Sequence, residues 1–197
     1  NIPNDWGTAV NIQCMVFGNM GQDSATGVAF TRNPSTGKNE FYGEWLPNAQ
    51  GEDVVSGIRT PYPINNSSKN ELTKNNTTLE ESFPELYQQL LSIKSILEKH
   101  YNDMQDIEFT IQNKTLYMLQ TRTGKRNGTA TLQIALDLFE KKAIDSTELI
   151  KRIQPSHIEE MMHPSFDPNS EKKSIVLTSG LPAGPGCAIG QAVFTSE

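Results

Sequence analysis

The chain has little cysteine, no long apolar run and no excess of basic residues, and each shortage excludes a class of protein. Only two cysteines occur among 197 residues, Cys14 and Cys187, and each lies inside an apolar run. They predict neither a disulfide framework nor a metal knuckle, so we expect a reducing, cytoplasmic compartment. No apolar run approaches the roughly 18 residues that a membrane-spanning helix needs. The net charge of -6 gives no basic footprint, so neither nucleic acid nor a membrane is expected as a partner.

The residues that are present indicate a folded protein. Hydrophobic residues make up 36% of the chain, which is enough for a core in one large or two small domains. The chain begins at Asn1 without a Met or a leader, and it stops at Glu197 directly after a strand-like run. We interpret both ends as cuts from a longer protein.

Three strands are predicted in the first part of the chain. Residues 10–17 alternate apolar side chains with polar or bulky ones, as a half-buried strand does. Residues 27–31 and 40–45 follow as a second and a third strand, separated by Asn-Pro and Thr-Gly turn signals. The loop at residues 18–21 is interpreted as simple turn chemistry and not as a phosphate loop, since neither a Lys nor a helix start follows it. Glu44 on the third strand is interpreted as structural.

Residues 106–111 and 116–122 predict an antiparallel hairpin. Both stretches contain strand-forming residues, and the first alternates acid or hydroxyl side chains with apolar ones. Asn113 and Lys114 supply turn chemistry between them.

Four polar side chains of this hairpin form the candidate site. Residues two apart on a strand share a face, so Asp106 projects with Glu108, and Gln120 with Arg122. A three-residue loop puts all four on one face with Glu108 opposite Gln120, whereas a two-residue loop sends the two pairs to opposite faces. Hard oxygen ligands beside a guanidinium suit magnesium and phosphate. The alternative is a solvated strand face with an exposed ion pair, and spacing alone leaves both open.

Helical spacing predicts a helix over residues 83–101 and a second over residues 129–142. A cap at Asp145 or Ser146 predicts a short helix that ends at Ile153, and Ser156 is expected to cap another that runs through Met162. Residues 58–82 are polar with almost nothing to bury, and a surface loop is expected there. The three histidines lack any partner arrangement for a triad or metal site, so no catalytic role is expected for His100, His157 or His163.

Two groups of residues resemble the nucleotide-binding domain of the pyruvate phosphate dikinase family. One is the hairpin, Asp106-Ile-Glu-Phe followed by Leu116-Tyr-Met-Leu-Gln-Thr-Arg and then Gly124-Lys-Arg. The other is the pair of stretches GVAFTRNPSTG and NAQGEDVVSGIRTP earlier in the chain. The resemblance implies an ATP-grasp domain in which the hairpin holds magnesium and the ATP phosphates.

By that resemblance the candidate ATP-binding residues are Glu52, Asp106, Glu108, Gln120 and Arg122. Mg²⁺ is the implied cofactor, with Asp106, Glu108 and Gln120 as its implied ligands. No catalytic residue is expected within the chain, because the family's phosphate-carrying His lies in a Thr-Ser-His-Ala-type motif that this sequence does not contain.

The resemblance also implies a reaction and its partners. The family converts ATP, phosphate and pyruvate to AMP, diphosphate and phosphoenolpyruvate through a phosphohistidine, and a homodimer is expected for the whole protein. This chain is expected to be inactive alone. A phosphoenolpyruvate synthase or related dikinase would share the hairpin, and a non-catalytic regulatory module could keep the same fold, so both alternatives stay open.

The expected fold class is α+β, an ATP-grasp-type antiparallel sheet with packed helices, followed by a helical segment and a linker strand. Residues 1–126 are assigned to the C-terminal half of the nucleotide-binding domain, with 58–82 as an insertion. Residues 127–179 are assigned to a helical connector. The Pro/Gly segment 180–186 and the strand 188–194 are interpreted as the start of the phosphohistidine domain, residues 180–197.

Overall fold

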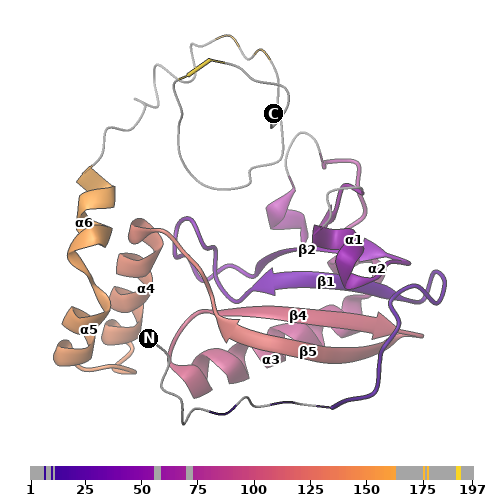
Figure 1. Ribbon diagram of the computed structural model, residues 1–197, viewed down its shortest axis with the longest axis horizontal. Helices are drawn as coiled ribbons and strands as arrows, with labels where there is room; N and C mark the ends of the chain where they lie inside the picture. The colour runs from indigo at the N-terminus through magenta and orange to yellow at the C-terminus, as the bar shows by residue number, and fades with distance from the viewer. Residues whose placement is uncertain are drawn as a thin grey trace. The chain divides into compact units, whose positions relative to one another are not determined.

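A computed structural model of the chain describes residues 7, 10, 12–55, 59–69, 73–162, 175, 177, 190 and 191. The predicted α+β class is confirmed, because five strands form one antiparallel sheet in the order β3-β2-β1-β4-β5, with helices beside it (Figure 1). The strands are Ala25–Phe30 (β1), Tyr42–Pro47 (β2), Tyr62–Pro63 (β3), Gln105–Gln112 (β4) and Thr115–Thr123 (β5). The helices are Gly51–Val55 (α1), Asn66–Ser68 (η1, a 3-10 helix), Leu79–Ser82 (α2), Pro84–Tyr101 (α3), Gly128–Glu140 (α4), Ser146–Arg152 (α5) and Pro155–Met162 (α6). None of the described helices has the length and apolar character needed to cross a membrane.

The chain divides into two compact units, each made from three stretches of sequence. The first consists of Asn1–Ala29, Tyr42–Lys94 and Asp106–Arg122, and the second of Phe30–Phe41, Ser95–Gln105 and Thr123–Glu197. The boundaries expected after residues 126 and 179 stay predictions. The predicted linker at 180–186 lies outside the described residues, as does the strand predicted at 188–194 apart from residues 190 and 191.

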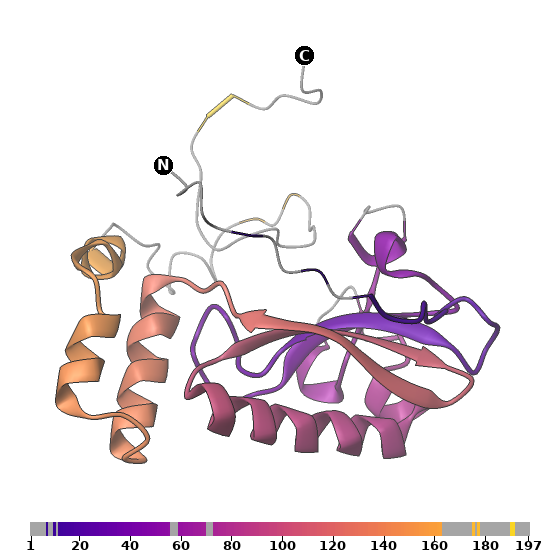
Figure 2. The same cartoon turned by 60° about the horizontal axis from the view of Figure 1, so that its bottom comes forward.

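In the first unit, the sheet buries one face beneath α3 (Figure 2). Ile107, Phe109 and Ile111 alternate along β4 and are completely buried, as is Leu90 of α3. A Cβ atom at Gly27 would lie 2.5 Å from the ring of Phe109, so the ring packs over this position of β1 only because it is glycine. The predicted helix over residues 83–101 is confirmed, with a proline at its first position, where the missing N–H costs no helical bond.

The strand predicted for residues 10–17 is wrong. Its described residues form no strand, and the side chains of Val10 and Ile12 are 75% and 97% exposed. Alternation predicts a strand only where a neighbouring edge supplies backbone partners. The Phe17 N–H donates to the Gln112 side chain at 2.8 Å instead.

The unstructured surface loop expected within residues 58–82 is also wrong for the residues described there. The segment contains β3, η1 and α2, and it buries Ile64 and Leu79 completely. A capping box starts α2, because the Thr78 hydroxyl accepts the Glu81 N–H while the Glu81 carboxylate accepts the Thr78 N–H. Local side-chain bonds of this kind order a polar sequence that has few apolar residues.

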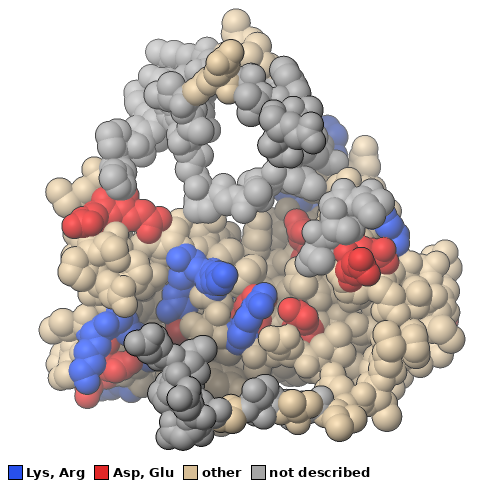
Figure 3. Space-filling view, in the orientation of Figure 1, with Lys and Arg blue, Asp and Glu red and all other residues tan. Residues whose placement is uncertain are grey.

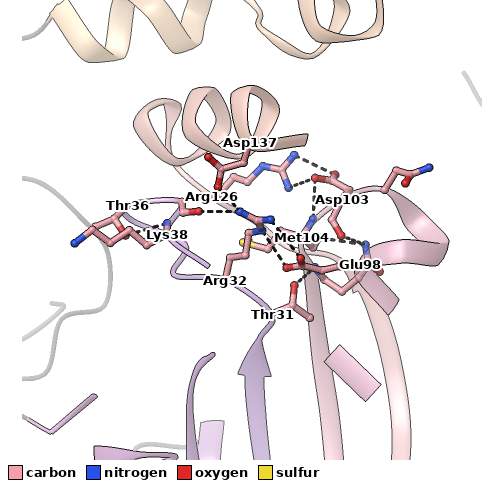
Figure 4. A network of polar contacts seen from close by, with 12 residues as sticks. Thr31, Arg32, Thr36, Lys38, Glu98, Asp103, Met104, Arg126 and Asp137 are labelled. Atoms are coloured by element: carbon pink, nitrogen blue, oxygen red, sulfur yellow. Dashed lines mark hydrogen bonds and ion pairs between the residues drawn. The ribbon is translucent and has the colours of Figure 1, made fainter. Parts of the chain in front are cut away.

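In the second unit, a buried arginine joins three stretches of the chain. Arg32 is 1% exposed, its Nε lies 3.0 Å from Glu98 of α3, and its Nη1 lies 2.7 Å from Asp137 of α4 (Figure 4). A buried guanidinium needs such partners, since an unpaired charge away from water is strongly destabilising. Beside this cluster, completely buried Met104 packs against α4 through Ala130, Ile134 and Leu138.

Caps define where the helices of the second unit begin. The predicted cap at Asp145 is confirmed, since its side chain accepts the Glu148 N–H at 2.7 Å. The cap predicted at Ser156 is wrong, because α6 already begins at Pro155. Pro155 lacks an N–H and tolerates the first helical position, which explains the earlier start.

Thr78→Ala should lower the free energy of unfolding by about 1 kcal/mol, because it removes the acceptor for the first turn of α2. The exposed neighbour Thr77 serves as the control, and Thr77→Ala should leave stability nearly unchanged. Urea unfolding of both variants measures the difference. Equal stability of the two would show that the capping box does not order this segment in solution.

Candidate functional site

The β4–β5 hairpin closes with a two-residue turn. Asn113 and Lys114 have positive φ angles of 49° and 60°, the combination that defines a type I′ turn. Neighbouring groups hold the turn, since the Asn113 N–H donates to the Ser24 Oγ at 3.1 Å and the Lys114 N–H to the Asp23 carbonyl at 2.8 Å. The three-residue loop that would place the candidate residues together is therefore not formed.

At the end of the hairpin away from the turn, its open end, β4 and β5 pair in a different register from the one that the turn sets. A regular ladder that starts at this turn would place Thr121 opposite Asp106. The Gly124 N–H instead donates to the Met104 carbonyl at 3.0 Å, and that pairing places Arg122 opposite Asp106. Between the turn and Arg122, β5 therefore has one residue more than β4, which is a β-bulge.

The burial of β5 agrees with a bulge. Of its nine residues, only Leu116 and Thr121 are half-buried, and they are five positions apart. In a regular strand an odd separation would put them on opposite faces. With the extra residue between them, Leu116 lies opposite Ile111 and Thr121 opposite Ile107, so both are on the buried face. Arg122 is then on the other face, with Asp106.

Arg122 bridges the two predicted carboxylates. Its Nε donates to Asp106 Oδ2 at 2.7 Å, and its Nη2 lies 3.9 Å from Glu108 Oε1. The Asp106 side chain is only 10% exposed, whereas the Arg122 side chain is 58% exposed. The hydrogen bond that Arg122 donates to Asp106, with the charges of both acids, raises the pKa of Arg122. Figure 3 shows acidic and basic side chains next to each other on this face.

Glu44 lies on the same sheet face as these carboxylates, a placement that its sequence context did not indicate. It is two residues from Leu46, which packs in a cluster with Val28 of β1. On β1, Thr26 shares the face of Val28, and its hydroxyl lies 3.4 Å from that of Thr110, which shares the face of Glu108. Side chains alternate between the two faces of each strand, but this alternation could have predicted the placement of Glu44 only if the pairing of the strands had been known.

Burial raises the pKa of the Glu44 carboxyl above its usual value. The side chain is half-buried, and loss of hydration disfavours the charged form. A raised pKa of an acid on the same face as two further carboxyl groups is found both in polar sites and at buried strand residues.

The other two candidate residues, Gln120 and Glu52, are both exposed. Gln120 is an exposed residue of β5, and its position opposite Glu108 stays a prediction. Glu52 is exposed in the first turn of α1, a helix that packs through Val54 on the Leu46 cluster. Both residues belong to the first unit, as do Asp106, Glu108 and Arg122.

The side-chain oxygens of the candidate residues are ligands of the kind that magnesium prefers. Carboxylate and amide oxygens are hard ligands, and Asp106, Glu108 and Gln120 supply only oxygen. Within the described ranges, however, no group of three or more His, Cys, Asp or Glu could hold a metal ion. The chain therefore offers a pair of acids at which a cation would need further ligands, such as an amide, water or phosphate.

The comparisons with known proteins all identify the same family. A family model described as the pyruvate phosphate dikinase AMP/ATP-binding domain matches residues 1–89 and 65–143. The chain is 52% identical over 196 residues to the pyruvate, phosphate dikinase of Rhizobium meliloti (strain 1021), and 51% identical over 197 residues to that of Clostridium symbiosum. It is 53% identical over 191 residues to the chloroplastic pyruvate, phosphate dikinase of Flaveria pringlei. These alignments cover 100%, 100% and 97% of this chain but 22%, 21% and 19% of the relatives, so the chain spans about a fifth of their length.

Glu44→Gln should change how stability depends on pH. A carboxyl whose pKa is raised by folding contributes stability that is complete below its unfolded pKa and is lost as the pH rises through its folded pKa. That loss begins as the pH rises above 4.5, the ordinary pKa of the carboxyl in the unfolded chain. The variant should therefore lose less stability than the parent between acid and neutral pH.

Urea unfolding at a series of pH values measures this dependence. The exposed glutamate Glu140 of α4 gives a matched control, and Glu140→Gln should keep the parental dependence. Identical curves for Glu44→Gln and the parent would show that Glu44 is not desolvated.

Proposed function

Because the chain belongs to the pyruvate phosphate dikinase family through its AMP/ATP-binding domain, we propose that it forms one wall of the ATP-grasp nucleotide site of a dikinase. The observation that carries the proposal is the bridge from Arg122 to Asp106 and Glu108. It brings a guanidinium, which suits phosphate, and two carboxylates, which suit a metal ion, together on one sheet face.

Each of these side chains has a role that follows from its chemistry. The guanidinium of Arg122 is exposed enough to form bidentate hydrogen bonds with phosphate oxygens. Asp106, Glu108 and Gln120 are the proposed ligands of Mg²⁺, which neutralises phosphate charge when it is bound. Glu52 is proposed to face the nucleotide from α1. The hydrogen bond from Arg122 holds the Asp106 carboxylate in one orientation before any ligand binds.

For the whole protein we propose the reaction that the family resemblance implies. ATP, phosphate and pyruvate would give AMP, diphosphate and phosphoenolpyruvate, with a histidine as the intermediate phosphate carrier. Phosphoryl transfer depends on positioning and on charge neutralisation, and both are properties of the hairpin face. A homodimer and a cytoplasmic location are part of the same proposal, although four relatives are described as chloroplastic.

Glu108→Gln should weaken magnesium-dependent ATP binding by roughly tenfold or more, because a charge-assisted interaction worth about 1.5–3 kcal/mol is lost. Lys114→Gln is the matched control: Lys114 is also an ion-paired residue of this hairpin, but it pairs with Asp23 at the turn. Equilibrium dialysis with labelled ATP, with Mg²⁺ or with EDTA, measures both variants. Parental affinity of Glu108→Gln, with folding intact, would show that Glu108 is only a solvated strand residue.

The chain alone should form neither phosphoenolpyruvate nor a phosphohistidine. Its histidines are His100, His157 and His163, and none lies in a carrier motif. The purified chain, incubated with γ-labelled ATP and Mg²⁺, should carry no acid-labile, base-stable phosphate. Stoichiometric label on any of the three histidines would overturn the assignment of the carrier to another part of the protein.

A further inference from the structure

We infer that Asp103 and Arg126 are positioning residues, a pair that holds the open end of the β4–β5 hairpin in the register that places Arg122 beside Asp106. The functional meaning of this inference rests on the proposed nucleotide site. The structural part of the inference, that the pair sets the register of the hairpin, does not depend on the proposed nucleotide site. Neither residue is proposed to touch the nucleotide.

The register of this hairpin needs an explanation, because its two ends differ by one residue. The type I′ turn at Asn113 and Lys114 is complete in itself and favours a regular ladder. That ladder would turn Arg122 to the buried face and place Thr121 opposite Asp106. The ion pair of the candidate site therefore exists only because the open end adopts the other register.

Burial along β5 selects its register only weakly. Seven of its nine residues are exposed, including the apolar residues Tyr117, Met118 and Leu119 at 41%, 36% and 37%. A strand with little to bury on either face is prone to slip by one residue. The register must therefore come from contacts at its ends.

Asp103 and Arg126 supply such a contact at the open end. Arg126 Nη2 donates to Asp103 Oδ2 at 3.0 Å, and its Nη1 lies 2.7 Å from Asp103 Oδ1, an ionic contact at which no hydrogen bond forms (Figure 4). Their side chains are only 13% and 17% exposed. A charge-assisted hydrogen bond of low exposure is stronger and more directional than a surface ion pair.

The pair is anchored to the rest of the second unit. Asp103 Oδ1 also accepts the Met104 N–H at 2.9 Å, and Met104 is completely buried against α4. Arg152 of α5 lies 4.0 Å from the same oxygen, and its Nη1 donates to the Asn102 carbonyl at 2.7 Å. Asp103 is thus fixed from several sides, two residues before β4 begins.

A fixed Asp103 determines the pairing through a short length of chain. Arg126 follows β5 by three residues, so its bond to Asp103 limits how far β5 can slide along β4. The Gly124 N–H then meets the Met104 carbonyl, and Arg122 is carried to the position opposite Asp106. The turn keeps its own register, and the bulge in β5 takes up the extra residue.

The test removes both charges with Asp103→Asn and Arg126→Met in one variant and reads the register by NMR. In the parent, a strong Hα–Hα contact is expected between Gln105 and Thr123, the close pair next to Asp106 and Arg122. In the variant, that contact should move to Gln105 and Arg122, and the Arg122 Nε–H should lose its protection from solvent exchange. ATP affinity should fall roughly tenfold, as for loss of a charge-assisted bond.

Two further variants separate positioning from general stability. Lys125→Met removes the exposed cation next to Arg126 and should leave the contacts unchanged. Deletion of Leu119 removes one residue from β5 between Leu116 and Thr121, so that both ends of the hairpin agree without a bulge. In the background that lacks the pair, this deletion should restore the contact between Gln105 and Thr123, the protected Arg122 Nε–H and the ATP affinity.

Each outcome of these experiments either supports or overturns the inference. An unchanged contact between Gln105 and Thr123 in the variant without the pair would overturn it. If that variant does not fold and the deletion of Leu119 does not rescue it, the pair is a general structural element and the inference is also overturned. If the register moves as expected but the parent binds no nucleotide, the positioning stands and the proposed function fails.

Discussion

The hydrogen bond from Arg122 to Asp106 is the contact on which the proposed site depends, and it exists in only one pairing of β4 with β5. A strand that slips by one residue presents the opposite set of side chains to each face. In the other pairing Arg122 would face α3 and could not reach either carboxylate. The turn, the bulge and the contacts at the open end therefore matter as much to the site as the charged residues themselves.

Features set by neighbouring residues could be predicted from the sequence. The helix α3 follows from apolar residues at helical spacing, and α5 from its Asp145 cap. The two strands of the hairpin follow from alternation, and the turn residues Asn113 and Lys114 follow from their side-chain chemistry. Membership of the family follows from the hairpin motif and from two stretches earlier in the chain, and the comparisons confirm it.

Features set by distant partners could not be predicted. Residues 10–17 have the alternation of a strand but form none among those described, because alternation does not say whether an edge is available. The segment with the Thr78 capping box has the composition of a loop but is ordered by a few local bonds. The bulge in β5 depends on the Gly124 contact with Met104, twenty residues away in sequence. Glu44 joins the face of the carboxylates only through strand pairing.

The ion pair between Arg122 and Asp106 also bears on how the proposed site would receive a nucleotide. Before a nucleotide binds, Arg122 neutralises Asp106, so two carboxylates can lie close together on a sheet face without strong repulsion. A phosphate group would compete with Asp106 for the same guanidinium. If the proposed nucleotide site is right, the ion pair stabilises the hairpin before binding and opens when a phosphate group arrives with its cation.

The most direct test of the central claim is the paramagnetic broadening that Mn²⁺ with ADP causes in the NMR spectrum of the chain. Mn²⁺ accepts the same oxygen ligands as Mg²⁺ and broadens nearby amide signals. The account predicts that the strongest broadening is centred on Asp106, Glu108, Gln120 and Arg122 and disappears with EDTA. Broadening centred elsewhere in the chain, with these four signals unaffected, would contradict it.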